Sequence, residues 1–197
     1  MEPLVSISAT SRPANFTAHA LALVNDELGR RVGPPTVFDC REISLPFPGQ
    51  GTTEDAKRLK EAIAQAPGVV IGTPEYHGGF SAMAKLIIEN LGFPSALAGK
   101  PVALMGVAAG RIGAIKSLEQ LRGVCSHVGA LVLPGSVSIA GVQNVFDRDG
   151  RCTDTQVEKE LRGLATSLVD YLDRHVCPLY TLESMVRGDD PARATPS

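Results

Sequence analysis

Two kinds of segment alternate along the chain. Short, continuous apolar runs occur at residues 4–9, 36–40, 68–72, 102–107 and 130–133. Runs of this kind are typical of strands that are buried on both faces of a sheet. Between and after them, apolar residues recur at the spacing of an amphipathic helix, over residues 16–31, 54–66, 83–91, 112–128 and 157–172. The pattern therefore predicts five strands and five helices in strict alternation.

This alternation indicates an α/β fold with a parallel sheet and helices on both faces. Right-handed crossovers restrict the topology to a doubly wound sheet, in which ligands bind beyond the carboxyl ends of the strands. The loops after the first, third and fourth strands are therefore the ones to examine. We predict a single domain over residues 1–177. Residues 178–197 lack helical periodicity, so we expect a C-terminal tail that is mobile or packs on a partner subunit.

Composition narrows the classes of function. The chain has 197 residues, a net charge of −2 and 44% hydrophobic residues, as ordinary globular proteins do. The charge gives no support for a nucleic-acid partner or a membrane surface, and we see neither a signal peptide nor an apolar stretch that could span a bilayer. The four cysteines are scattered without a C-x-x-C pair. We therefore expect reduced thiols, a cytoplasmic location and no metal site.

The first loop, I-S-A-T-S-R-P-A-N-F-T at residues 7–17, joins a strand to a helix, so the helix amides point towards it. Hydroxyl and amide side chains surround the guanidinium of Arg12, which gives the donors and the charge that a phosphate monoester requires. The loop contains neither G-x-x-x-x-G-K-[ST] nor G-x-G-x-x-G, so the nucleoside-triphosphate and dinucleotide loops are excluded. On composition alone, these side chains serve equally well to cap a helix and build a turn.

The second loop is T-P-E-Y-H-G-G-F-S-A-M-A-K, residues 73–85. Its glycine pair lets a flat ligand lie close to the main chain, and Tyr76 and His77 offer an aromatic edge. The alternative is a plain strand-to-helix turn with a solvated His77. The third loop, G-V-A-A-G-R-I-G at residues 106–113, also leaves its backbone open. There, Arg111 either serves a negative group or is a surface arginine on a tight turn.

These motifs resemble those of the NADPH-dependent FMN reductases, flavodoxin-like flavoproteins that include azo-, quinone- and chromate-reducing enzymes. Residues 74–85 follow the family pattern P-E-Y-N-x-x-x-x-G-x-L-K, and Pro74, Glu75, Tyr76 and Lys85 are retained. The first loop is similar to the family's G-S-x-R-x-x-S-x-[NT] loop. Residues 144–154 match the usual approach to the family's last helix, and the resemblance extends from about Leu4 to Leu172.

The resemblance implies a flavodoxin-like three-layer sandwich whose five-stranded parallel sheet has the order 2-1-3-4-5. It also implies that the first loop binds the FMN phosphate, that residues 74–78 line the isoalloxazine and ribityl groups, and that residues 108–112 follow the polar edge of the ring. The implied cofactor-binding residues are Thr10, Ser11, Arg12, Asn15, Phe16, Thr17, Pro74, Glu75, Tyr76, His77, Gly78, Ala108, Ala109, Gly110, Arg111 and Ile112. No residue is assigned a catalytic role, because the flavin carries the chemistry.

The implied activity is an FMN-dependent NAD(P)H oxidoreductase. NADPH or NADH passes a hydride to the flavin, and a small acceptor (free flavin, quinone, azo compound or metal oxyanion) is then reduced in a ping-pong cycle. The resemblance also implies a homodimer or homotetramer with each FMN near an interface. The alternative is a flavodoxin-like binding module or electron carrier without reductase turnover, although such carriers are usually more acidic. A hydrolase is disfavoured because no G-x-S-x-G motif is present.

The first loop departs from the family pattern at two positions. Ala9 stands where the family has a glycine, and Asn15 replaces a serine. If position 9 requires a positive φ, alanine costs about 1 kcal/mol there. Asn15 keeps donor capacity, so we expect weakened FMN binding rather than its loss.

Overall fold

The computed structural model describes residues 2–177, and the predicted tail at 178–197 lies outside that range. The elements in chain order are β1 (Val5–Ser8), α1 (Phe16–Val32), β2 (Thr36–Asp39), α2 (Glu54–Gln65), β3 (Val69–Tyr76), β4 (Gly79–Phe80), α3 (Ala82–Glu89), β5 (Pro101–Val107), α4 (Ile115–His127), β6 (Leu131–Val132), β7 (Val137–Ile139), a 3-10 turn (Val142–Asn144), α5 (Thr155–Tyr171) and a π-helical turn (Leu172–Val176). Each of the predicted helices is present, with bounds shifted by a few residues.

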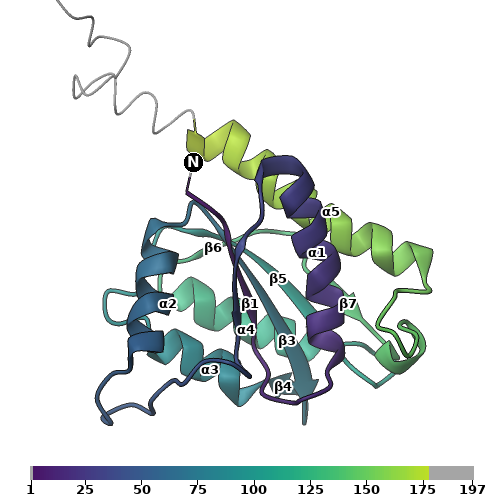
Figure 1. Ribbon diagram of the computed structural model, residues 1–197, viewed down its shortest axis with the longest axis horizontal. Coiled ribbons are helices and arrows are strands. Elements are labelled where there is room, and N and C mark those ends of the chain that lie inside the picture. The colour runs from purple at the N-terminus through teal and green to yellow at the C-terminus, as the bar shows by residue number, and fades with distance from the viewer. Residues whose placement is uncertain (1, 178–197) are drawn as a thin grey trace, which may run out of the picture.

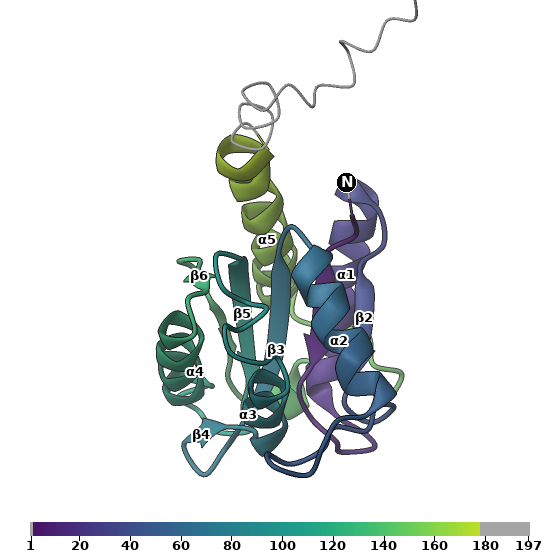
Figure 2. The same cartoon turned by 90° about the vertical axis from the view of Figure 1, so that its left-hand side faces the viewer.

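The main strands form a parallel sheet in the order β2-β1-β3-β5-β6. This is the predicted order 2-1-3-4-5 once the extra short strand β4 is counted in the numbering. The sheet lies between two helical layers, with α1 and α5 on one face and α2, α3 and α4 on the other (Figures 1 and 2). The predicted three-layer α/β architecture is confirmed.

Successive strand residues pack into two different cores. On β3, Val69 and Ile71 pack on the side of α2, α3 and α4, whereas Val70 packs on the side of α1 and α5. On β5, Leu104 and Met105 divide between the two cores in the same way. Because both faces are buried, these strands need apolar residues at every position. This explains why continuous apolar runs located them correctly.

Strand β3 extends beyond its predicted end at residue 72 and turns back into β4, which was not predicted. Glu75 pairs with Phe80, and Tyr76 with Gly79. Between the two pairs, His77 (φ 52°) and Gly78 (φ 76°) form a type I′ turn. His77 is the one non-glycine residue of the described chain with a positive φ. Ala9 therefore has an ordinary backbone conformation, and the glycine that it replaces is not needed there.

The predicted fifth strand, residues 130–133, is shortened to β6, and after a break it is followed by β7, a short strand that was not predicted. Strand β6 pairs with the beginning of β5, and β7 pairs with its end. Between them, Pro134 and Gly135 (φ 78°) leave the strand conformation. Arg122 of α4 fills the break, because its guanidinium donates to the carbonyl oxygens of Val132 (3.2 Å) and Leu133 (3.0 Å). Its Nη2 also donates to Oγ of Ser136 (2.9 Å).

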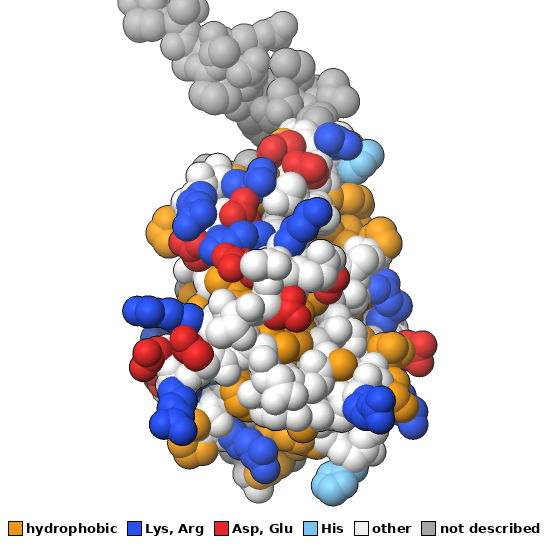
Figure 3. Space-filling view, turned by 90° about the vertical axis from the view of Figure 1, so that its right-hand side faces the viewer, with side chains coloured by type: hydrophobic (Ala, Val, Ile, Leu, Met, Phe, Trp, Pro, Cys, Tyr) orange, Lys and Arg blue, Asp and Glu red, His pale blue; other side chains and the backbone are white. Residues whose placement is uncertain are grey.

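Charged side chains of both signs are interspersed on the face that carries α1 and α5 (Figure 3). Arg162 of α5 donates to Asp26 (2.6 Å) and Glu27 (3.4 Å) of α1, and to Glu158 (2.9 Å) of its own helix. The hydrogen bonds that Arg162 donates to Asp26 and Glu158 raise the pKa of its guanidinium, so this link between the helices stays charged. No helix among residues 2–177 combines the length and apolar character that crossing a membrane requires.

Candidate functional site

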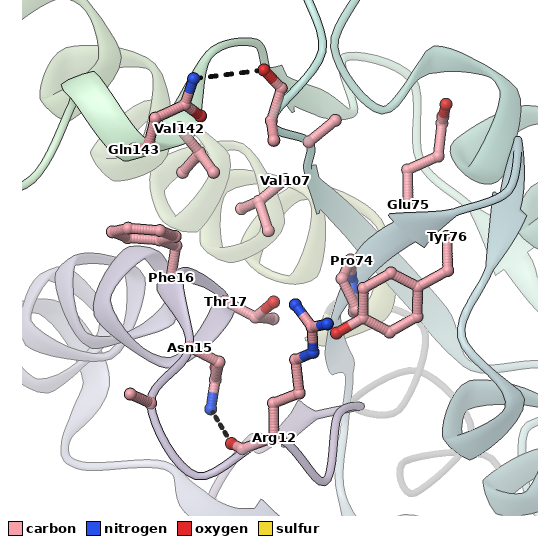
Figure 4. A pocket seen from close by; sticks show the side chains of 13 residues that line it. Arg12, Asn15, Phe16, Thr17, Pro74, Glu75, Tyr76, Val107, Val142 and Gln143 are labelled. Carbon is pink, nitrogen blue, oxygen red and sulfur yellow. Dashed lines mark hydrogen bonds between the residues drawn. The ribbon is translucent and has the colours of Figure 1, made fainter.

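A cavity of about 370 Å³ lies at the carboxyl ends of β1, β3 and β5, where the fold predicts a ligand (Figure 4). Its volume falls within the usual range for small-molecule sites. The three predicted loops and the 3-10 turn after β7 surround it. Its lining consists of Arg12, Ala14, Asn15, Phe16, Thr17, Pro74, Glu75, Tyr76, Val107, Ala108, Ala109, Val142 and Gln143.

Asn15 holds the first loop in shape. Its Oδ1 accepts the backbone N–H of Ala18 (2.7 Å), which makes Asn15 the N-cap of α1. Its Nδ2 donates to the carbonyl oxygen of Arg12 (2.9 Å), as the lower part of Figure 4 shows. Both ends of the amide are therefore engaged within the loop, as the capping interpretation of this segment requires.

Two other polar groups of the same loop and helix are not engaged in this way. The Thr17 side chain is only 1% exposed, and its Oγ1 has no hydrogen-bond partner among the described residues. It lines the cavity beside the guanidinium of Arg12 (Figure 4). Within residues 2–177, no carboxylate forms an ion pair with Arg12. A buried polar group without a partner costs about 1–3 kcal/mol, so a ligand that offers an acceptor recovers that loss.

The outer side of the first loop is fixed by Arg41, which follows β2. Arg41 Nη1 donates to the carbonyl oxygen of Pro13 (2.8 Å), and Arg41 Nε donates to the carboxylate of Asp39 (3.0 Å). Partial burial alone would raise the pKa of Asp39. The hydrogen bonds from Arg41 outweigh burial and lower that pKa below its ordinary value of 3.8. Ser11 lies on this outer side, in a shallow hollow with Cys40 and Arg41.

The second loop is tied to helix α4. The Glu75 carboxylate accepts the backbone N–H of Ser117 (3.1 Å) in the first turn of α4, a helix whose own N-cap residue, Ala114, provides no side-chain bond. In Figure 4 the Glu75 side chain points away from Arg12 and Thr17. Gln120 Nε2 donates to the carbonyl oxygen of Gly78 (3.1 Å). Pro74 and Tyr76 line the cavity, whereas His77 is exposed at the hairpin tip.

The third loop contributes through its first residues. Ala108 and Ala109 line the cavity. The chain then turns outward, since the carbonyl oxygen of Gly110 accepts the N–H groups of Gly113 (3.3 Å) and Gly141 (3.1 Å). Ile112 is 73% exposed, and Arg111 is also exposed.

The cavity brings together Arg12, Asn15, Phe16, Thr17, Pro74, Glu75, Tyr76, Ala108 and Ala109 of the predicted set. The remaining predicted residues lie outside its lining, and they are Thr10, Ser11, His77, Gly78, Gly110, Arg111 and Ile112. Among these, Thr10 is buried directly behind the wall, where its Oγ1 accepts the backbone N–H of Arg12 (3.4 Å).

The sequence interpretation missed one wall. Val142 and Gln143 belong to the 3-10 turn after β7, and Gln143 Nε2 donates to the carbonyl oxygen of Ala109 (3.4 Å) (Figure 4). Ligands bind beyond the carboxyl ends of parallel strands, and β7 is parallel to β5 and ends at the same edge of the sheet. The same rule would therefore have indicated this turn if β7 had been predicted. Ala14 and Val107 were missed as well, since neither carries a polar group.

No cysteine is among the described residues that line the cavity. Cys40 and Cys125 are buried and free, and burial raises the pKa of each thiol to about 12. Both are therefore unreactive near neutral pH.

Residues 3–144 match the protein family described as NADPH-dependent FMN reductase. The chain is 32% identical over 175 residues to an NAD(P)H-dependent FMN reductase of Pseudomonas aeruginosa, which covers 82% of this chain and 92% of that protein. It is 37% identical over 117 residues to an NADPH azoreductase of a Bacillus species, which covers 58% of this chain and 65% of that protein.

Solved structures agree on the fold. The flavoenzyme FerB, an NAD(P)H:(acceptor) oxidoreductase from Paracoccus denitrificans, matches with a TM-score of 0.69 at 24% identity, over 89% of this chain and 99% of that one. A flavodoxin from the domain Archaea matches with a TM-score of 0.58 at 12% identity, over 87% of this chain and 99% of that one. At these identities the likeness shows the fold alone, and it confirms the predicted flavodoxin-like architecture.

Proposed function

Since this chain belongs to the NADPH-dependent FMN reductase family, we propose that its cavity holds FMN, with Arg12 and Thr17 binding the phosphate. Membership makes the chain a flavin-dependent oxidoreductase that uses FMN, with NADPH or NADH as the co-substrate. Pro74, Tyr76 and Ala108 would line the ring system.

The observation that carries this assignment is the buried hydroxyl of Thr17 beside the guanidinium of Arg12, since within residues 2–177 the hydroxyl has no hydrogen-bond partner and the guanidinium has no ion pair. Both lie at the N-terminus of the 17-residue helix α1, where backbone N–H groups and the helix dipole favour an anion. The rest of the lining is largely apolar, with Phe16, Val107 and Val142 among its members. A flat aromatic ligand that ends in a phosphate matches this division of the cavity.

When bound, FMN supplies the redox chemistry, by taking a hydride from the nicotinamide and passing electrons to a second substrate. The chain's own residues bind the cofactor, orient it and shield it from water. The described lining contains no histidine, lysine or cysteine, and its carboxylate, Glu75, is bound to the N–H of Ser117. We therefore assign no side chain as a catalytic acid or base.

The acceptor and the assembly complete the proposal. We propose a small acceptor (free flavin, quinone, azo compound or metal oxyanion) that is reduced in a ping-pong cycle, and the azoreductase relative supports this class. We also propose a cytoplasmic homodimer or homotetramer. Light scattering would give the assembly, and parallel lines in double-reciprocal kinetics would support the ping-pong order.

The deciding experiment is a visible absorption spectrum of the purified protein after FMN is added and the excess removed. A bound flavin spectrum that bleaches with NADPH in the absence of oxygen is the expected result. If no flavin is retained, steady-state NADPH oxidation with free FMN distinguishes loose binding from a lost site. Absence of both binding and turnover would favour the alternative of a binding module without reductase activity.

A further inference from the structure

The guanidinium of Arg12 rests against the aromatic ring of Tyr76. Its central carbon lies 5.2 Å from the ring centroid, within the distance at which a cation is attracted to the face of an aromatic ring. Figure 4 shows the two side chains meeting inside the cavity, with the Thr17 hydroxyl on the other side of the guanidinium in this view. Arg12 belongs to the first loop and Tyr76 to the end of β3, so the contact joins two walls of the site.

The ring of Tyr76, rather than its hydroxyl, makes this contact. The Oη of Tyr76 is 3.4 Å from Oγ1 of Thr10, which is long for a bond between two hydroxyl groups. The N–H of Arg12 donates to the same Oγ1 at 3.4 Å and fixes only the backbone of the loop. No carboxylate within residues 2–177 pairs with Arg12, so the ring of Tyr76 is the side-chain contact that the described structure gives for its guanidinium.

We propose that Tyr76 is a positioning residue, whose ring holds the Arg12 guanidinium beside Thr17 so that it is already oriented for a phosphate monoester. This inference rests on the proposed function, since the phosphate of FMN is the anion in question. An arginine side chain has several rotatable bonds, and orienting it before binding removes part of the entropy loss on association. Tyr76 thereby links the ring end of the site to its phosphate end.

The test compares FMN with riboflavin, which has the same ring and ribityl chain but no phosphate. Dissociation constants for both are measured by flavin fluorescence in the wild type, Tyr76→Phe, Tyr76→Leu and Arg12→Gln. Tyr76→Leu removes the aromatic face and should lower the preference for FMN over riboflavin about two- to fivefold, the range of an exposed cation–π contact. Tyr76→Phe retains the face and should retain the preference. The riboflavin affinity of each variant reports whether the ring site is intact.

The double variant Tyr76→Leu/Arg12→Gln completes a thermodynamic cycle. If Tyr76 acts through Arg12, Tyr76→Leu should not change the FMN preference further once Arg12 is glutamine. An unchanged preference in the single Tyr76→Leu variant, or an equal loss in both backgrounds, would overturn the positioning role. A wild type that binds FMN and riboflavin equally well would instead refute the phosphate assignment in the proposed function. The two failures are therefore distinguishable.

Discussion

The first loop and the β3–β4 hairpin form opposite walls of the cavity, and they use their polar groups differently. In the hairpin, the Glu75 carboxylate caps α4 through Ser117, and the Gly78 carbonyl accepts from Gln120. On the other wall, Thr17 has no partner within the described chain and Arg12 has no ion pair there. The hairpin's polar groups hold the structure together, whereas the first loop and the start of α1 leave two polar groups available to a ligand.

This difference shows that the number of polar side chains in a loop is a poor measure of binding. Asn15 and Glu75 both line the cavity, yet each satisfies N–H groups at the start of a helix. Exposed N–H groups are a general requirement of helix N-termini, and nearby polar residues meet it first. Within this cavity, Thr17 and Arg12 are the groups left available to a ligand once the helix N-termini are capped.

The largest expected effect is on FMN affinity, at the wall formed by the first loop and the start of α1. Arg12→Ala should raise the dissociation constant for FMN about 10- to 100-fold, because a hydrogen bond to a charged group contributes roughly 1.5–3 kcal/mol. Fluorescence titration measures it, and the affinity for riboflavin should change little. Arg111→Ala is the matched control, since Arg111 is exposed and outside the cavity lining. Similar FMN affinities for Arg12→Ala and the wild type would show that Arg12 does not bind the phosphate.

Removing the cap on the hairpin wall should affect stability. Glu75→Ala leaves the N-terminus of α4 without its partner for Ser117 and should lower the free energy of unfolding by about 1–2 kcal/mol. Urea denaturation measures this change. Glu119→Ala, at an exposed position of the same helix, should change stability much less. A shift in the preference for FMN over riboflavin in Glu75→Ala, with stability unchanged, would contradict the capping role.

Asn15 lies in the first loop, but it caps a helix as Glu75 of the hairpin does. Asn15→Ala should lower the free energy of unfolding by about 1 kcal/mol, since the cap of α1 is lost. Asn15→Ser, which introduces the residue of the family pattern, should retain most of the stability because serine caps nearly as well. If Asn15→Ser instead tightened FMN binding more than tenfold, position 15 would bind the phosphate and would not serve the helix cap alone.

A smaller gain in stability is expected at the hairpin tip. His77 has φ 52° at the first position of the type I′ turn, where asparagine followed by glycine is preferred. His77→Asn should therefore raise the free energy of unfolding by about 0.5 kcal/mol, measured as a higher melting temperature. His77→Ala removes the imidazole without relieving the strain and should bring no gain. Equal melting temperatures for His77→Asn and His77→Ala would show that the positive φ at residue 77 causes no measurable strain.

A pH-dependent effect on stability is expected at the charge pair behind the first loop. The pKa of Asp39 is lowered in the folded state, so the ionised pair with Arg41 stabilises the fold above pH 3.8, and this contribution is lost as pH falls below that value. A partly exposed pair of this kind is worth at most about 1 kcal/mol. The stability difference between the wild type and Asp39→Asn should therefore shrink in acid. A difference that is constant from pH 7 to pH 2 would contradict the pairing.

The central strands β3 and β5 could be located from the sequence because they carry apolar residues on both faces. Val69–Ile71 and Val102–Met105 were found because each residue meets a core. Strand β4 has only Gly79 and Phe80, and its neighbouring glycines suggested a loop. Strand β7 follows Pro134 and Gly135 and contains a serine, so its apolar pattern is too short to detect. These short strands depend on tertiary pairing with β3 and β5, which no local pattern encodes.

The position of the site could be predicted, but the use of each side chain could not. The rule for parallel sheets correctly indicated the strand ends that surround the cavity. The partners of Asn15 and Glu75 depend on where Ala18 and Ser117 lie in space, and the lone hydroxyl of Thr17 appears only when its burial is known. Val142 and Gln143 were missed because β7, the strand that delivers them, was missed.

The break between β6 and β7 has a consequence for how the molecule behaves in a crowded solution. This pair of short strands forms an outer edge of the sheet, and open edges are where sheets of different molecules join and aggregate. Here the edge offers two consecutive residues in β6 and three in β7. Arg122 also occupies the carbonyl oxygens of Val132 and Leu133 with a positive charge. An incoming strand would find no continuous row of free backbone groups along β6 and β7, so the break disfavours edge-to-edge pairing at this side of the sheet.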